Sequence, residues 1–227
     1  MPPEPRRRGC IEDFAMRPTH PINAPTGVEA WLLVSITLTA LVLSGIQPVD
    51  RLTWFMEVVW VMAGLPLILA TWRHFPLTRL LCWLLLLHAL ILVVGGHYTY
   101  SKVPIGLWFQ DAFELSRNHY DRLGHFAQGF VPAILARELL LRKTPLRPGP
   151  WLFYLVASCC LAFSAFFEFI EWWAALLMGG DADAYLATQG DIWDTQWDMF
   201  LALCGAVLAQ LWLARWHDRQ LPGRAAP

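Results

Sequence analysis

Hydrophobic residues are gathered into long runs along this chain, and short polar stretches separate the runs. A helix needs roughly 20 mostly apolar residues to cross the hydrocarbon core of a bilayer. Five runs reach that length or come close to it, at residues 28–46, 53–71, 78–95, 151–178 and 192–216. The pattern therefore predicts an all-α protein whose chain crosses a membrane several times.

A sixth segment, residues 120–141, is equally long but begins with polar residues. Asp121, Arg122 and His125 occupy its first turns, and an apolar stretch follows them. Such a helix can cross a bilayer if its polar start faces protein or water instead of lipid. We expect it to be the fourth of about six transmembrane helices.

Basic residues provide a test of this count, because cytoplasmic loops of membrane proteins carry an excess of Lys and Arg. With six spans, 13 of the 17 basic residues fall in the two tails and in the second and fourth loops. The other loops hold only Arg51, Lys102, Arg117 and Arg122. Without the fourth span this alternation would be lost, so we expect six spans with both termini in the cytoplasm.

The chain divides into one membrane domain and two tails. Residues 1–26 are polar, and the arginines Arg6 to Arg8 have no apolar run beside them, which predicts a disordered cytoplasmic tail and not a signal peptide. Residues 27–217 form the predicted six-helix domain, and residues 218–227 form a second cytoplasmic tail.

Composition supports the bilayer as solvent and excludes one class of partner. Hydrophobic residues make up 56% of the 227 residues and charged residues only 15%, which is more apolar surface than one soluble domain could bury. The formal net charge is −1 and no basic face is present, so we expect no nucleic-acid partner. The five cysteines lack metal-ligand spacing and are expected to be small core side chains.

Acidic residues show the opposite bias, since ten of the 18 lie on segments that this topology places at or near the outer face. Helical spacing puts several on shared faces: Asp121 and His125 are four residues apart, and Glu168 and Glu171 are three apart. A third group, of aspartates, lies at the start of the sixth span, and a histidine ends the third span. These residues are Asp191, Asp194, Asp198 and His97.

An unpaired charge inside a bilayer costs about 3 kcal/mol or much more, so something must compensate these acids. One interpretation is a structural hydrogen-bond network with Arg117 or Arg122 as the counter-ion. Because the acids outnumber these cations, the sequence also predicts shared protons or a bound divalent cation. Glu57 could join the group. The loop acids Asp111, Glu114, Asp181 and Asp183 are expected to be solvated.

Three isolated histidines outside the spans, His20, His74 and His217, are interpreted as surface residues, and His88 as a helix-packing residue of the third span whose hydrogen bonds are satisfied.

Four ordered motifs resemble the YjdF-like bacterial inner-membrane proteins. They are His97-Tyr-Thr-Tyr100, Asn118-His-Tyr-Asp-Arg-Leu-Gly-His-Phe126, Glu168-Phe-Ile-Glu-Trp172 and the run from Gly190 to Met199. The resemblance implies a multi-pass protein of the inner membrane and brings no activity with it. A fainter similarity to the VanZ-like proteins rests on Asp121-Arg122-x-x-His125-Phe126 and on the acids of the last two spans. In that pattern amides stand where this chain has Glu171 and Asp198.

Three functions remain open on this reading. In the first, a membrane enzyme uses a metal held by Glu168, Glu171, Asp191, Asp194, Asp198 and His97. There, His125 and Asp121 act in catalysis, Arg122 clamps a phosphate, and the substrate is a phospholipid or polyprenyl-linked molecule of the envelope. The second is a proton- or cation-coupled carrier or sensor, and the third is a scaffold with a structural polar network. The sequence does not indicate an oligomeric state.

Overall fold

The computed structural model describes residues 22–178 and 188–222, and within them the chain is entirely helical. The helices are α1 (Gly27–Ser44), α2 (Arg51–Thr71), α3 (Arg79–Tyr98), the 3₁₀ turn η2 (Tyr100–Lys102), α4 (Pro104–Ala112), α5 (Tyr120–Lys143), α6 (Pro150–Met178) and α8 (Asp194–Asp218). A long helix lies over each of the six predicted spans. The expectation of an all-α, multi-pass membrane protein is confirmed.

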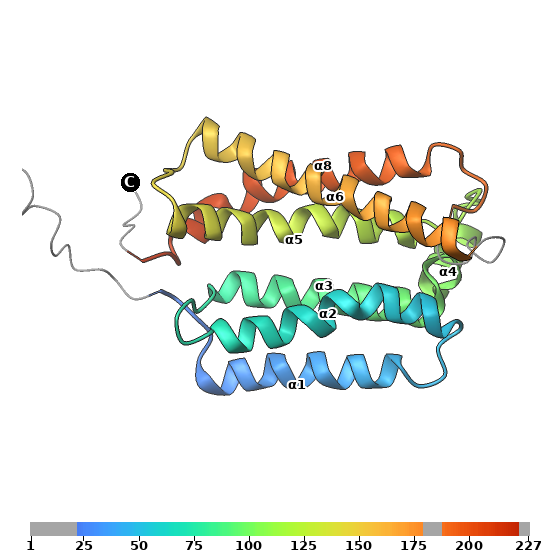
Figure 1. Ribbon diagram of the computed structural model, residues 1–227, viewed down its shortest axis with the longest axis horizontal. Helices are drawn as coiled ribbons and strands as arrows, with labels where there is room; N and C mark the ends of the chain where they lie inside the picture. Colours follow the sequence, from blue (N-terminus) through green and yellow to red (C-terminus); the bar gives the residue numbers. More distant parts are fainter. Residues whose placement is uncertain (1–21, 179–187, 223–227) are drawn as a thin grey trace, which may run out of the picture.

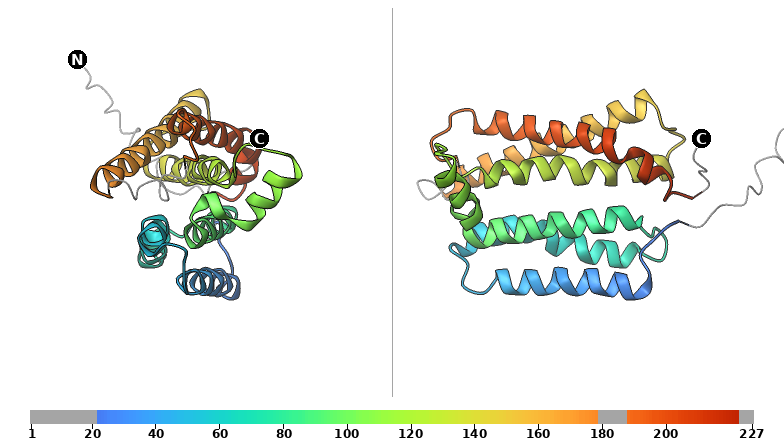
Figure 2. Two further views of the ribbon diagram at one scale, coloured as in Figure 1. Left: turned by 90° about the vertical axis from the view of Figure 1, so that its right-hand side faces the viewer. Right: turned by 180° about the vertical axis from the view of Figure 1, so that it is seen from behind.

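The six long helices form two layers (Figure 1). One layer contains α1, α2 and α3, and the other contains α5, α6 and α8, while the short α4 lies across one end. We call this end the α4 end. The opposite end, where both described ends of the chain meet, is the termini end (Figure 2). There the Asn23 amide donates to the Gln220 carbonyl at 3.0 Å, and the Arg79 amide donates to the Asn23 carbonyl at 2.8 Å.

Five of the helices are long and apolar enough to cross a bilayer: α1, α2, α3, α6 and α8. Helix α5 has 24 residues but a more polar sequence, and it lies between α3 on one side and α6 and α8 on the other. Neighbouring helices therefore shield its polar side chains from lipid, which is the arrangement that polar spans require. That α5 is itself a sixth span stays a prediction.

Helices α5 and α8 pack closely because glycines face the partner backbone. A Cβ atom at Gly129 would collide with the Ala202 carbonyl, and one at Gly205 would collide with the Phe126 carbonyl. Small residues of this kind let membrane helices approach one another and gain van der Waals contact. This contact fixes the register between the helix that carries Asp121 and His125 and the helix that carries Asp194 and Asp198.

The chain packs against the bundle beyond the end of α8. Gln220 and Leu221, assigned to a cytoplasmic tail, are 5% and 4% exposed. The Gln220 side chain accepts a hydrogen bond from the Leu80 amide at 2.9 Å, so it satisfies an amide in the first turn of α3. Residues 1–21 of the predicted N-terminal tail and residues 223–227 of the predicted C-terminal tail lie outside the described residues.

Candidate functional site

Acidic side chains from four helices meet inside the α4 end of the bundle. Asp121 comes from the first turn of α5, Glu168 from the last third of α6, Asp198 from the second turn of α8 and Glu57 from α2. These four are 6%, 6%, 2% and 4% exposed, respectively. The convergence that the helical spacing predicted is therefore present, with Glu57 included.

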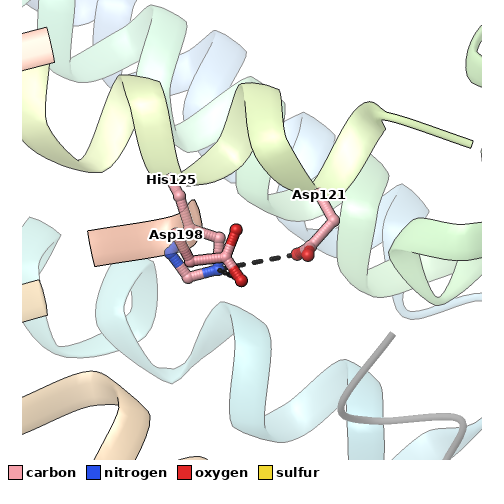
Figure 3. Close-up of side chains that lie close together, drawn as sticks. All are labelled: Asp121, His125 and Asp198. Carbon is pink, nitrogen blue, oxygen red and sulfur yellow. Dashed lines mark ion pairs between the residues drawn. The ribbon is translucent and has the colours of Figure 1, made fainter. Parts of the chain in front are cut away.

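His125 lies between two aspartates (Figure 3). Its Nε2 atom is 3.6 Å from Asp121 Oδ1 and 3.8 Å from Asp198 Oδ2. Both distances exceed hydrogen-bond length. One ligand atom from each of the three residues lies within 4.8 Å of the other two. A cation with bonds of roughly 2.0–2.6 Å needs ligand atoms about 3–4 Å apart, so the three groups are close to the spacing of a coordination site.

The other ring nitrogen of His125 is occupied. Nδ1 lies 3.1 Å from Oε1 of Gln128, one turn further along α5. If Nδ1 donates its proton to that oxygen, the Nε2 lone pair of the neutral ring faces two carboxylates. Three electron-rich atoms facing one another repel unless a proton or a metal ion lies between them. Metal-binding histidines are held in this way, with the second nitrogen donating to an oxygen of the protein.

Two further glutamates of α6 border this group. Glu168 Oε1 is 3.9 Å from His125 Nδ1, and neither that oxygen nor Asp198 Oδ1 has a hydrogen-bond partner in the part of the chain that the structure describes. Glu171, three residues further on, interacts electrostatically with Glu168, Asp121 and Glu57. Glu57 in turn interacts with the Tyr100 side chain.

The two arginines nearby are engaged with the acids closest to the loops. Arg117, 5% exposed, binds Asp194, and its Nη1 lies 3.5 Å from Asp191 Oδ2. Its Nη2 is 3.9 Å from Asp121. Arg122 donates to Asp191 at 2.6 Å and covers the Trp197 ring at 5.3 Å. These contacts neutralise Asp191 and Asp194 and leave the deeper acids with little positive charge.

The loop before α5 is built around Asn118, which is completely buried. Its side-chain amide donates to the carbonyls of Ser101 and Val103 at 3.0 and 3.1 Å, and its Oδ1 accepts from the Tyr120 amide at 3.0 Å. Gln189 closes the arrangement through two hydrogen bonds to the Asn118 backbone. Asn118 thereby joins η2 to the start of α5, the segment that carries Arg117 and Asp121.

Just outside the span, His119 faces Arg122, whose Nη1 approaches the His119 Nδ1 at 3.3 Å. Burial, followed by the charges of Arg122 and Arg117, lowers the pKa of His119. The neutral ring can therefore accept a hydrogen bond from Arg122, which cannot itself accept one.

Comparison with known protein families now decides where the chain belongs. The family described as predicted membrane protein (DUF2238) matches residues 29–219. The chain belongs to this family. The inner membrane protein YjdF of Escherichia coli (strain K12) is 55% identical over 188 residues, which are 82% of this chain and 90% of that protein. No solved structure matches the chain. The predicted resemblance to YjdF-like proteins is confirmed, and the fainter similarity to VanZ-like proteins stays a prediction.

In this member of the DUF2238 family, two of the predicted site residues are placed differently from the rest. His97 Nδ1 lies 2.8 Å from the Ser44 carbonyl oxygen at the end of α1, and its ring packs edge-on against Tyr98 at 4.6 Å. His97 thus joins α3 to α1 and does not belong to the group of Asp121, His125 and Asp198. Arg122 donates through Nη2 to Asp191, while its Nε has no hydrogen-bond partner among the described residues.

A second buried polar cluster, at the termini end, was missed by the sequence reasoning. Glu138 of α5 and His217 of α8 are both completely buried, which corrects the prediction that His217 is a surface histidine. Glu138 accepts from the Thr78 hydroxyl at 2.7 Å, from Arg142 at 2.6 Å and from His217 Nε2 at 3.0 Å. The Thr78 amide approaches both of its oxygens at 3.2 and 3.3 Å. We call these four residues, together with Arg137, the Glu138 cluster.

The remaining predictions concern isolated residues. Asp111, Glu114 and His74 are exposed, as expected, whereas His20, Asp181 and Asp183 lie outside the described residues. His88 departs from the expectation, because its buried Nε2 has no hydrogen-bond partner among the described residues. Arg137 of α5 is 3% exposed and donates to Asp218 at 2.9 Å. The sequence carries a signal for one pair of this cluster, since Glu138 and Arg142 stand four residues apart near the end of a helix.

Proposed function

We propose that this protein is a metal-dependent membrane enzyme that acts on an envelope lipid or lipid-linked substrate. The observation that carries the proposal is the surplus of acids around His125. Asp121, Asp198, Glu168, Glu171 and Glu57 meet there, and Arg117 at 3.9 Å from Asp121 is the nearest guanidinium contact that the described residues provide. Buried carboxylates without cations are costly, and a divalent ion would remove that cost.

The ligand set favours a hard or borderline cation. Asp121, His125 and Asp198 are the ligands that the geometry supports best, whereas Glu168 approaches the opposite ring nitrogen, Nδ1, at 3.9 Å and would have to move to join them. Carboxylate oxygens suit Mg²⁺, Mn²⁺ or Ca²⁺, and the imidazole shifts the preference toward Zn²⁺ or Fe²⁺. Such an ion would polarise a phosphoryl or acyl oxygen or lower the pKa of a bound water. The acids not used as ligands, Glu171 and Glu57, could accept a proton from that water or from the substrate.

Metal content is the direct test of this proposal. Protein purified in detergent should contain one equivalent of a divalent metal by elemental analysis, and addition of that metal to chelator-treated protein should raise the unfolding temperature. Asp198→Asn should abolish both effects. Glu114→Gln, which alters an exposed acid at the same end, should change neither. If no metal is found and none of Mg²⁺, Mn²⁺, Ca²⁺, Zn²⁺ or Fe²⁺ shifts unfolding, the proposal is wrong.

Catalysis needs a separate measurement. Lipid extracts from cells that express the wild type should differ in phospholipid or polyprenyl-phosphate species from extracts of cells that express Asp198→Asn at the same level. Equal lipid profiles alongside intact metal binding would remove the enzymatic part of the proposal and keep the metal site.

We further propose that the protein lies in the inner membrane with both termini in the cytoplasm and the acidic site toward the outer face. The excess of Lys and Arg in the tails and in alternate loops supports this orientation. Asp111 and Thr144 are exposed at opposite ends of the bundle. In a background without native cysteines, Asp111→Cys should react with an impermeant maleimide on intact spheroplasts, and Thr144→Cys should react only after lysis. The reverse pattern would invert the orientation.

A proton- or cation-coupled carrier is the second candidate, and one observation favours it. The acids Glu57, Asp121 and Glu171 line a cavity that continues into the membrane-spanning part of the bundle. In proteoliposomes, a carrier would move protons or the bound cation down an imposed gradient, and Glu171→Gln would stop the flux. An enzyme would leave such a gradient intact.

A further inference from the structure

A cavity of about 450 Å³ begins at the acidic site and runs along the bundle toward the termini end. This volume is within the range of roughly 300–1,000 Å³ that is typical of sites for small ligands. Along α2 and its C-cap residue, the lining extends from Glu57 to Trp72. At ~1.5 Å per residue these fifteen steps span ~22 Å, most of the ~30 Å thickness of a bilayer core.

The lining changes character along this length. Near the α4 end the wall contains Glu57, Tyr100, Asp121, His125 and Glu171. Further along α1, α2 and α3 it is mostly apolar, with side chains such as Leu33, Leu65, Ile68 and Leu85, and its polar members there are Thr37 and His88. The cavity therefore has a charged head and a long apolar body.

The apolar body lies between α1 and α2, with α3 as its floor. Near the α4 end the two helices are joined, because the Trp54 indole donates to the Ser44 hydroxyl at 3.0 Å. Toward the termini end, residues of α1 and α2 such as Trp31 and Leu69 line the same space. Both helices are apolar enough to cross a bilayer, so a ligand that enters between them comes from lipid and not from water.

From this division we infer that the cavity binds one hydrocarbon chain of a membrane lipid, with the polar head of that lipid at the group of Asp121, His125 and Asp198. The inference rests on the proposed function and names the substrate class of the same site. A chain of methylene groups can fill an apolar body of this length without bringing polar groups of its own, and His88 is a lining side chain whose Nε2 has no hydrogen-bond partner among the described residues. The acids determine which polar heads can bind. The head is either positively charged, or it is an anionic group whose charge a bound divalent ion neutralises.

Gly64 offers a way to block the cavity without disturbing the fold. It lies on α2 among the lining residues, and a Cβ atom there would meet no other atom within 4 Å. Replacing a helix-interior glycine also favours the helix by up to about 1 kcal/mol. The neighbouring Ala63 is exposed and does not line the cavity, so Ala63→Phe is the matched control for Gly64→Phe.

The experiment uses the full chain in liposomes that contain a phosphatidylglycerol with a diazirine in the middle of one acyl chain. After irradiation, mass spectrometry compares labelling of lining residues such as Trp60 and Phe163 with labelling of Trp212, which is 69% exposed on α8. The lining segments should be labelled in excess over Trp212. Gly64→Phe should abolish this excess, and Ala63→Phe should preserve it.

Each outcome bears on the inference. Labelling of the lining that equals that of Trp212, or an excess that survives Gly64→Phe, would overturn it. Gly64→Leu replaces Gly64→Phe if the larger variant elutes as aggregate. Asp198→Asn separates the two proposals. If this variant loses the metal but keeps the excess labelling, both proposals are supported. If the wild type shows the excess labelling but binds no divalent metal, the site for the lipid chain stands and the metal-dependent function is wrong.

Discussion

Helix α5 carries a buried acid toward each of its ends, and the two acids have opposite surroundings. Glu138, in the Glu138 cluster, accepts hydrogen bonds of 2.6 to 3.3 Å from three residues. Asp121, at the α4 end, is 3.6 Å from His125 and 3.9 Å from Arg117, and two more acids face the same histidine. Glu138 has all the hydrogen-bond donors that it can use, whereas Asp121 shares too few donors with the neighbouring acids.

The difference separates a structural cluster from a functional one. Burying a charge costs several kcal/mol, and this cost is recovered only if hydrogen bonds satisfy the group completely. In the Glu138 cluster the contacts also define the tautomer of the histidine. Arg137 approaches His217 Nδ1 at 3.0 Å, and an arginine can only donate a hydrogen bond. The ring proton of His217 is therefore on Nε2 and points to Glu138. At the α4 end no such closed network exists among the described residues, which is the condition expected of a site that awaits a ligand.

The largest expected effect comes from making the same type of substitution, Glu to Gln, once in each cluster. Glu138→Gln places an amide among the donors of Thr78, Arg142 and His217, and it should destabilise the protein by about 3–5 kcal/mol, as breaking a buried pair does. Glu168→Gln removes a charge from an overcrowded group, and without metal it should be neutral or stabilising. Unfolding in detergent with a chelator present measures both. Equal losses in the two variants would abolish the distinction.

The next effect depends on metal. At a concentration 100 times its Kd, a bound ion should stabilise the wild type by about 2.7 kcal/mol. Asp198→Asn should lose this gain, because Asp198 Oδ2 is one of the three converging ligand atoms. Glu138→Gln should keep the full gain despite its lower starting stability. A gain that disappears in Glu138→Gln as well would mean that the ion acts on the whole bundle and not at the α4 end.

Coupling between acids gives a third comparison. Asp121→Asn and Asp198→Asn each relieve the same repulsion at His125 Nε2, so their effects on metal-free stability should be non-additive by about 0.5–3 kcal/mol. The pair Asp198→Asn and Glu138→Gln acts at opposite ends of the bundle and should be additive within about 0.5 kcal/mol. Unfolding of the single and double variants provides both cycles. Additivity in the first pair would indicate independent acids.

The sequence was sufficient to predict the architecture and most of the α4-end site. Apolar runs identify the helices because a bilayer demands them, and i,i+4 spacing puts Asp121 beside His125 without knowledge of the fold. Glu168 and Asp198 follow from the same reasoning once the helices are antiparallel neighbours.

The Glu138 cluster and the place of His97 could not be predicted in this way. Glu138 and His217 are 79 residues apart, and their contact depends on the close packing of α5 on α8 at Gly129 and Gly205. His217 stands next to charged residues near the chain end, where sequence alone favours solvent exposure. His97 has the correct depth for the site but points to α1, because the rotation of a helix about its axis is set by its packing partners.

The smallest expected effect asks whether location or hydrogen bonding determines the role of an acid. Asp50 is at the α4 end, yet its Oδ1 accepts from the Thr53 amide at 2.7 Å as the N-cap of α2. That backbone hydrogen bond lowers the pKa of Asp50, so its contribution to stability is present above pH 4 and is lost as the pH falls through the lowered value. Asp50→Ala should cost about 1 kcal/mol, Asp50→Asn should cost almost nothing, since asparagine caps equally well, and neither should alter metal content. If Asp50→Ala instead removes the metal, then every acid at this end serves the site, and satisfaction by hydrogen bonds is not what distinguishes the two clusters.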